Sequence, residues 1–113
     1  MNVVVCVSGG GTNLQALIDG CESGFLEGIS ISCVISNNAS AYALERAKRA
    51  GIDTLVISPA DYPSRKDFDA AFSGKMRALV PDIVVLAGFL VKIPEEMVND
   101  FPMRIINYTS TTY

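Results

Sequence analysis

A run of three glycines followed by two polar residues is the part of the sequence best suited to bind a ligand. Gly9, Gly10 and Gly11 precede Thr12 and Asn13, and the run separates a strand-like segment from a helix-like one. Glycines let the backbone approach a ligand closely, and the first turn of a helix presents free N–H groups with partial positive charge. The loop therefore predicts a site for a phosphate monoester, with a ligand-free tight turn as the alternative.

The same loop fits a dinucleotide or a nucleoside triphosphate poorly. In the G-x-G-x-x-G fingerprint the third glycine would fall at Leu14. The acidic residue that binds ribose is also missing after the next strand-like run, where Asn37 and Asn38 stand. No G-K-[ST] follows the glycines, so a triphosphate loop is not expected. These absences favour a site for a single phosphate.

A second segment with chemical potential follows the most hydrophobic run of the chain, after Gly88. Its apolar residues could form a wall or a backbone hydrogen-bonding edge for a flat heterocycle. They could equally continue the core into the next helix, and for Phe89 the two interpretations stay open. The candidate edge consists of Leu90, Val91, Lys92 and Ile93.

Two single polar residues complete the set of candidates. Arg65 stands at a helix start, where it is either a solvated cation or a contact to an anionic ligand. Asn107 closes the last strand-like run, and its amide hydrogens could stabilise an oxyanion that develops during acyl transfer. A turn-forming role for Asn107 is the alternative.

Composition excludes several other chemistries. None of the 113 residues is a histidine, so the chain offers no histidine base, no Ser-His-Asp triad and no histidine-ligated metal site. Cys6, Cys21 and Cys33 match no metal-ligand spacing. Cys6 and Cys33 stand inside apolar runs, which indicates buried, reduced thiols of a cytoplasmic protein. The formal net charge of −3 argues against nucleic acid and anionic membranes as partners. The start of the sequence does not have the form of a secretory signal.

The candidate residues are positioned by alternating strands and helices in one domain, residues 1–113. Thr12 and Gln15 have the form of a capping box, Ser64 is a helix cap, and Gly51 stands where a helix stops. We expect strands at 1–7, 29–35, 54–57, 83–87 and 104–108, with helices near 12–21, 40–50, 64–79 and 94–101.

Continuous apolar strands separated by helices predict a doubly wound parallel sheet of the α/β class. Right-handed crossovers give the strand order 3-2-1-4-5, with the first two helices on one face and the last two on the other. Ligands of such sheets bind beyond the carboxyl ends of the strands, where the order reverses. Here that position lies between the first and fourth strands, so the glycine run and the segment after Gly88 should meet.

A series of motifs, in order and at family-like spacing over residues 1–107, resembles the folate-dependent phosphoribosylglycinamide formyltransferases of purine synthesis. The first is the amino-terminal strand that leads into S-G-G-G-T-N-L-Q at 8–15. The others are I-S-N at 35–37, L-E-R-A at 44–47 before Gly51, S-R at 64–65, P-D-I-V-V-L-A-G-F at 81–89 and R-I-I-N at 104–107.

The resemblance implies a Rossmann-like fold of the formyltransferase type, of which this chain is the amino-terminal, phosphate-binding part. It implies that Gly11, Thr12 and Asn13 bind the phosphate of phosphoribosylglycinamide, and that Asn107 polarises the formyl group. It also implies that 10-formyltetrahydrofolate, the cosubstrate, contacts Arg65 and the edge formed by Leu90, Val91, Lys92 and Ile93.

The pattern departs from the family after Asn107. Thr109 occupies the position of the catalytic histidine in the Asn-x-His-Pro-Ser signature, and the sequence ends at Tyr113. A threonine hydroxyl cannot supply an imidazolium's charge or move its proton, so we expect no turnover from this chain. We also expect an exposed edge at the fifth strand and self-association through it.

Three alternatives remain at this point. Formyltetrahydrofolate hydrolase shares the fold and passes the formyl group to water, but it usually carries an additional amino-terminal domain. A stand-alone phosphate- or mononucleotide-binding module with flavodoxin-like topology would also use the glycine loop. A response-regulator receiver is less favoured, because residues 1–7 lack the acidic group expected at the end of its first strand.

Overall fold

Parallel strands form one sheet in the order β3-β2-β1-β4-β5, which confirms the predicted α/β fold. The computed structural model describes residues 1–24 and 27–108. The order of the strands reverses between β1 and β4. The strands are β1 (Asn2–Val7), β2 (Ser30–Ser36), β3 (Asp53–Val56), β4 (Ile83–Ala87) and β5 (Ile105–Tyr108).

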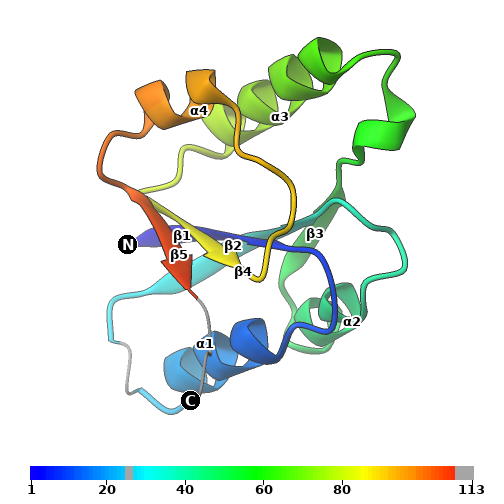
Figure 1. The fold of residues 1–113 in the computed structure, drawn as a ribbon. Coiled ribbons are helices and arrows are strands. Elements are labelled where there is room, and N and C mark those ends of the chain that lie inside the picture. Colours follow the sequence, from blue (N-terminus) through cyan, green and yellow to red (C-terminus); the bar gives the residue numbers. More distant parts are fainter. Residues whose placement is uncertain (25–26, 109–113) are drawn as a thin grey trace, which may run out of the picture.

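The helices lie in two layers, as the crossover rule predicted (Figure 1). In the figure, α1 and α2 pack below the sheet, and α3 and α4 pack above it. Within the part of the chain that the structure describes, no helix is long and apolar enough to cross a membrane. The helices are α1 (Thr12–Glu22), α2 (Tyr42–Arg49), the short 3-10 helix η1 (Pro59–Asp61), α3 (Arg65–Leu79) and α4 (Glu95–Asp100).

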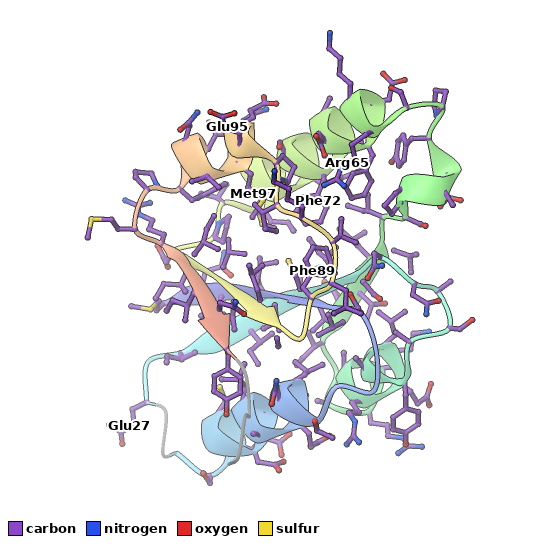
Figure 2. All side chains as sticks on the ribbon, in the orientation of Figure 1. Glu27, Arg65, Phe72, Phe89, Glu95 and Met97 are labelled. Carbon is purple, nitrogen blue, oxygen red and sulfur yellow. The ribbon has the colours of Figure 1, made fainter. Side chains whose placement is uncertain are left out.

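The core above the sheet is built on aromatic rings. Phe72 of α3 stacks on Phe89, which follows β4, with ring centroids 5.7 Å apart, and Phe68 lies 5.7 Å from Phe72. Phe89 therefore packs against the core above the sheet, as one of its two interpretations, a continuation of the core, expects (Figure 2). Cys6 and Cys33 lie buried in the same core as free thiols, and burial raises the pKa of both.

The core below the sheet is less complete near β5. An apolar cavity of about 170 Å³ lies there, and Ile106 of β5 is 48 % exposed. The cavity is lined by Val3, Leu17, Ile29, Ile83, Val85, Ile106 and Tyr108.

Two of the three predicted helix signals are confirmed. The Ser64 hydroxyl accepts a hydrogen bond from the backbone N–H of Asp67 at 3.2 Å and caps α3. Gly51 follows α2 with a left-handed φ of 74°. The predicted capping box of Thr12 and Gln15 is wrong. Gly11 occupies the N-cap with φ 80°, and no side chain caps α1, because the chain enters this helix from the left-handed region.

Two residues other than glycine adopt left-handed backbone angles among those the structure describes. Val80 (φ 47°) ends α3 just before β4, and Met103 (φ 59°) stands between α4 and β5. Both side chains are exposed. These turns lie at the amino ends of the strands, opposite the end where the candidate site residues lie, and they carry backbone strain.

Candidate functional site

The loops after β1 and β4 and the end of β5 meet beyond the carboxyl ends of the strands, as predicted. The backbone N–H of Leu90 donates to the Ser8 hydroxyl at 2.9 Å, which joins the first two segments. The Asn13 amide nitrogen donates to the carbonyl of Tyr108 at 3.4 Å, which joins the first segment to β5. The fold therefore brings the glycine loop, the edge after Gly88 and the strand of Asn107 to one place.

The glycine loop (residues 9–11) has a conformation that only glycine can adopt at its last position. Gly11 has φ 80°, and a Cβ there would lie 2.6 Å from the Cβ of Ala43 in α2. Helix α2 therefore packs directly against the backbone of the loop. Gly9 and Gly10 are exposed, and a Cβ at either would meet open space.

Helix α2 also holds the loop by hydrogen bonds. The backbone N–H of Ala43 donates to the carbonyl of Gly9 at 3.0 Å. The Nε of Arg46 donates to the carbonyl of Gly10 at 2.7 Å, and its Nη1 donates to Oε1 of Gln15 at 3.2 Å. Neither Ala43 nor Arg46 was identified as a site residue from the sequence, since the contact depends on how α2 docks.

Ser8 is a third residue whose contacts the sequence did not reveal. Its side chain is buried, and its hydroxyl donates to Oδ1 of Asn37 at 2.6 Å while it accepts from Leu90. One hydroxyl thus links the loops that follow β1, β2 and β4. The signals in the sequence were its place at the end of a buried strand and directly before the glycine run.

The edge after β4 is fixed by a few contacts. Arg65, the first residue of α3, donates to the carbonyl of Lys92 and pairs with Asp69 at 2.7 Å. Its guanidinium also lies 5.1 Å from the ring centroid of Phe68. Figure 2 shows Arg65 on the same side of the sheet as Phe72 and Phe89. Leu90 is 86 % exposed, whereas Val91 and Ile93 pack against the core above the sheet.

Asn107 lies on the outermost described strand with its side chain exposed. It stands opposite Leu86 of β4 in the register of the sheet. Since side chains alternate along a strand, Asn107 shares the face of Ile105, which packs against the core above the sheet. Thr109 lies outside the described residues.

One buried polar atom at the site lacks a partner. The Oδ1 atom of Asn13 is buried and accepts no hydrogen bond from any residue that the structure describes. Unpaired buried acceptors are rare in native proteins. The side-chain nitrogen of Asn13 donates to the carbonyl of Tyr108, so within the described chain the nitrogen of this carboxamide is paired and its oxygen is not.

Comparison with known proteins identifies a family and several relatives. The formyl transferase family model matches residues 1–110. Phosphoribosylglycinamide formyltransferase of Escherichia coli is 39 % identical over 107 residues, which are 95 % of this chain and 50 % of that protein. The trifunctional purine biosynthetic protein adenosine-3 of Drosophila melanogaster is also 39 % identical, over 93 % of this chain and 8 % of that protein.

Solved structures agree with the sequence relatives. Glycinamide ribonucleotide transformylase 1 of Symbiobacterium toebii superposes with a TM-score of 0.88 at 47 % identity, over 95 % of this chain and 50 % of that one. Phosphoribosylglycinamide formyltransferase of Coxiella burnetii, solved in complex with CHES, superposes with a TM-score of 0.88 at 41 % identity and with the same coverage of both chains.

The chain spans about half the length of the single-function relatives it matches. The resemblance inferred from the motifs is confirmed, and the chain corresponds to the amino-terminal half of such a protein. The chain belongs to the formyl transferase family.

Proposed function

We propose that this chain supplies the phosphate-binding half of a cytoplasmic phosphoribosylglycinamide formyltransferase in purine biosynthesis. The whole protein would transfer a formyl group from 10-formyltetrahydrofolate to the amine of phosphoribosylglycinamide. The observation that carries the proposal is the glycine loop at the start of α1, held in a ligand-ready shape by α2 in a chain of this family.

In this proposal, Gly11, Thr12 and Asn13 bind the substrate phosphate. The first N–H groups of a helix have no intrahelical partner and carry partial positive charge, so they suit a phosphate dianion. The unpaired, buried Oδ1 of Asn13 supports a ligand that also carries a hydrogen-bond donor, such as a ribose hydroxyl.

The folate cosubstrate is assigned to the edge after β4, formed by Leu90, Val91, Lys92 and Ile93, where Leu90 offers an exposed apolar side chain. Arg65 borders this edge through its hydrogen bond to the carbonyl of Lys92. Because the guanidinium already has protein partners, its role toward the folate is to hold the edge or to share its charge with an anionic group of the ligand.

The chemical step needs groups beyond these. The substrate amine attacks the formyl carbon, and Asn107 donates a hydrogen bond to the oxygen as it becomes negative. The tetrahedral species then loses the folate nitrogen, and the proton that the attacking amine gives up passes to that nitrogen as its bond to carbon breaks. Proton transfer in the family uses a histidine and an aspartate, and the 113 residues contain no histidine. We therefore expect binding without turnover from the 113 residues alone.

Calorimetry on the 113-residue chain tests the binding proposal. We expect phosphoribosylglycinamide to bind, inorganic phosphate to compete with it, and the dephosphorylated ribosylglycinamide to bind much more weakly. No heat at millimolar phosphoribosylglycinamide would contradict the proposal. Equal affinities for phosphoribosylglycinamide and its dephosphorylated form would instead show that the glycine loop does not bind the phosphate.

We further propose that the 113 residues self-associate through β5. This strand is the edge of the described sheet, its Ile106 is half-exposed, and the apolar cavity below the sheet opens beside it. Exposed edges with apolar surface tend to pair with other chains. Light scattering should give a mass above the monomer at micromolar concentrations, and a monomer mass throughout would refute this proposal.

A further inference from the structure

The outer side of the glycine loop is bound by α2 at successive positions. Two consecutive carbonyl groups, those of Gly9 and Gly10, accept hydrogen bonds from Ala43 and Arg46 of that helix. Gly11 then packs against Ala43 so closely that no side chain fits between them. Helix α2 therefore occupies one side of the loop, and a ligand can approach the loop from the other side.

The direction of these carbonyls fixes the direction of the next N–H groups. In a trans peptide the C=O of one residue and the N–H of the following residue point to opposite sides. Since the carbonyls of Gly9 and Gly10 point to α2, the N–H groups of Gly10 and Gly11 point away from it. Neither N–H group has an acceptor among the residues that the structure describes.

We propose that Arg46 is the positioning residue of the phosphate-binding loop: its side chain holds the Gly10 carbonyl against α2 and thereby aims the Gly11 N–H at the ligand. This inference rests on the proposed function. Arg46 acts through the loop and does not contact the ligand in this proposal. Its bond to Gly10 is the one side-chain hydrogen bond to a glycine-loop carbonyl within the described residues.

The guanidinium of Arg46 is itself held in place, which a positioning role requires. Its Nη1 donates a hydrogen bond to Gln15 of α1, and its Cζ atom lies 5.0 Å from the ring centroid of Tyr42. The planar fork of an arginine can bind two acceptors in fixed directions at once, whereas a lysine ammonium cannot. Arg46 thus ties the loop to both neighbouring helices, α1 and α2.

Arg49 provides a matched control on the same helix. Its guanidinium also lies over the Tyr42 ring, at 5.5 Å, and it donates to the Tyr42 hydroxyl and pairs with Glu45. It makes no contact with the glycine loop in the described chain. Arg46→Met and Arg49→Met therefore remove the same charge from the same helix, and only the first frees the Gly10 carbonyl.

The experiment measures phosphoribosylglycinamide affinity by calorimetry and the Gly10 and Gly11 amide signals by NMR, in both variants of the 113-residue chain. We expect Arg46→Met to weaken binding about tenfold, the size of one charge-assisted hydrogen bond, and to displace both amide signals. Arg49→Met should change the affinity less than twofold and leave the signals in place. Equal losses in both variants would overturn the inference in favour of overall charge.

Two further outcomes separate this inference from the proposed function. If the unsubstituted chain binds no phosphoribosylglycinamide, the proposed function fails, and unchanged Gly10 and Gly11 signals in Arg46→Met would then overturn the positioning role as well. Arg46→Lys keeps the charge but lacks the fork. Full affinity in Arg46→Lys with displaced amide signals would show that Arg46 contributes charge and not position, which also overturns the inference.

Discussion

The glycine loop and the edge after β4 follow neighbouring strands and line the same site, yet the protein holds them very differently. The loop has two consecutive carbonyls bound by α2 and a glycine packed against Ala43. The edge is joined to its surroundings by a hydrogen bond at each end, to Ser8 and to Arg65, and it leaves Leu90 almost fully exposed.

This difference matches the two ligands that we propose. A phosphate is small and rigid, so a loop fixed before binding loses little conformational entropy when it binds. A folate is a larger, flat molecule, and an edge with the exposed side chain of Leu90 can adjust to it while Phe89 packs in the core at the start of the edge. The following substitutions test this comparison, at the loop, at the link between the two segments, far from both, and at the edge.

The largest effect is expected at the fixed loop. Gly11→Ala should lower the free energy of unfolding by about 3 kcal/mol, because it combines a left-handed backbone with a close contact to Ala43. It should also abolish phosphate-dependent binding. Urea denaturation and calorimetry measure the two effects.

Gly10→Ala is the control for this prediction, since a Cβ there meets open space. Its free energy of unfolding should change by less than about 1 kcal/mol. Similar losses of stability in the two variants would mean that the close packing of α2 on the loop is not what makes the loop rigid.

The link between the two segments should break in Ser8→Ala. Loss of a buried hydroxyl that bonds Asn37 and Leu90 should cost about 1.5 kcal/mol of unfolding free energy and speed hydrogen exchange at the Leu90 amide. Ser36→Ala is a matched control, because Ser36 is also buried but its hydroxyl bonds Asn38 alone among the residues that the structure describes. Equal Leu90 exchange rates in both variants would contradict the link.

A stabilising change far from both segments sharpens the comparison by leaving the site intact. Val80→Gly relieves a left-handed φ on an exposed residue and should raise the free energy of unfolding by about 1 kcal/mol. Phosphoribosylglycinamide affinity should stay unchanged. A rise in stability accompanied by altered binding would show that the two ends of the sheet are coupled.

The smallest effect is expected at Arg65. Arg65→Met should lower the free energy of unfolding by less than about 1 kcal/mol, because the side chain is half-exposed, while it speeds hydrogen exchange along residues 90–93. Arg77→Met is matched in helix and exposure, but Arg77 pairs with Glu96 and Asp100 of α4. If Arg77→Met accelerates hydrogen exchange along residues 90–93 as much as Arg65→Met does, the contacts of Arg65 do not specifically stabilise the edge.

The sheet could be predicted because its information is local and redundant. Continuous apolar strands, the Ser64 cap and right-handed crossovers each pointed to the same topology. The glycine run also pointed to the right end of the sheet. These features depend on residue types in short windows, which a sequence displays directly.

The support of the site could not be predicted, because it depends on contacts between distant segments. Arg46 lies 36 positions beyond Gly10, and the Ser8 hydroxyl lies 82 positions before Leu90. The capping box failed for a related reason: once Gly11 packs on Ala43, its left-handed backbone fixes the helix start, and Gln15 bonds Arg46 and Asp19. Local preference gave way to tertiary packing at that point.

The close approach of α2 to Gly11 has a consequence for protein design. A designer who grafts the six residues 8–13 onto another strand-to-helix junction would transfer the chemistry but not its shape, since Ala43 and Arg46 belong to a different helix. The smallest transplantable unit is therefore two consecutive β-α units, residues 2–49, with a small side chain kept at position 43. In a library of variants, positions 11 and 43 should tolerate substitution least and should constrain one another.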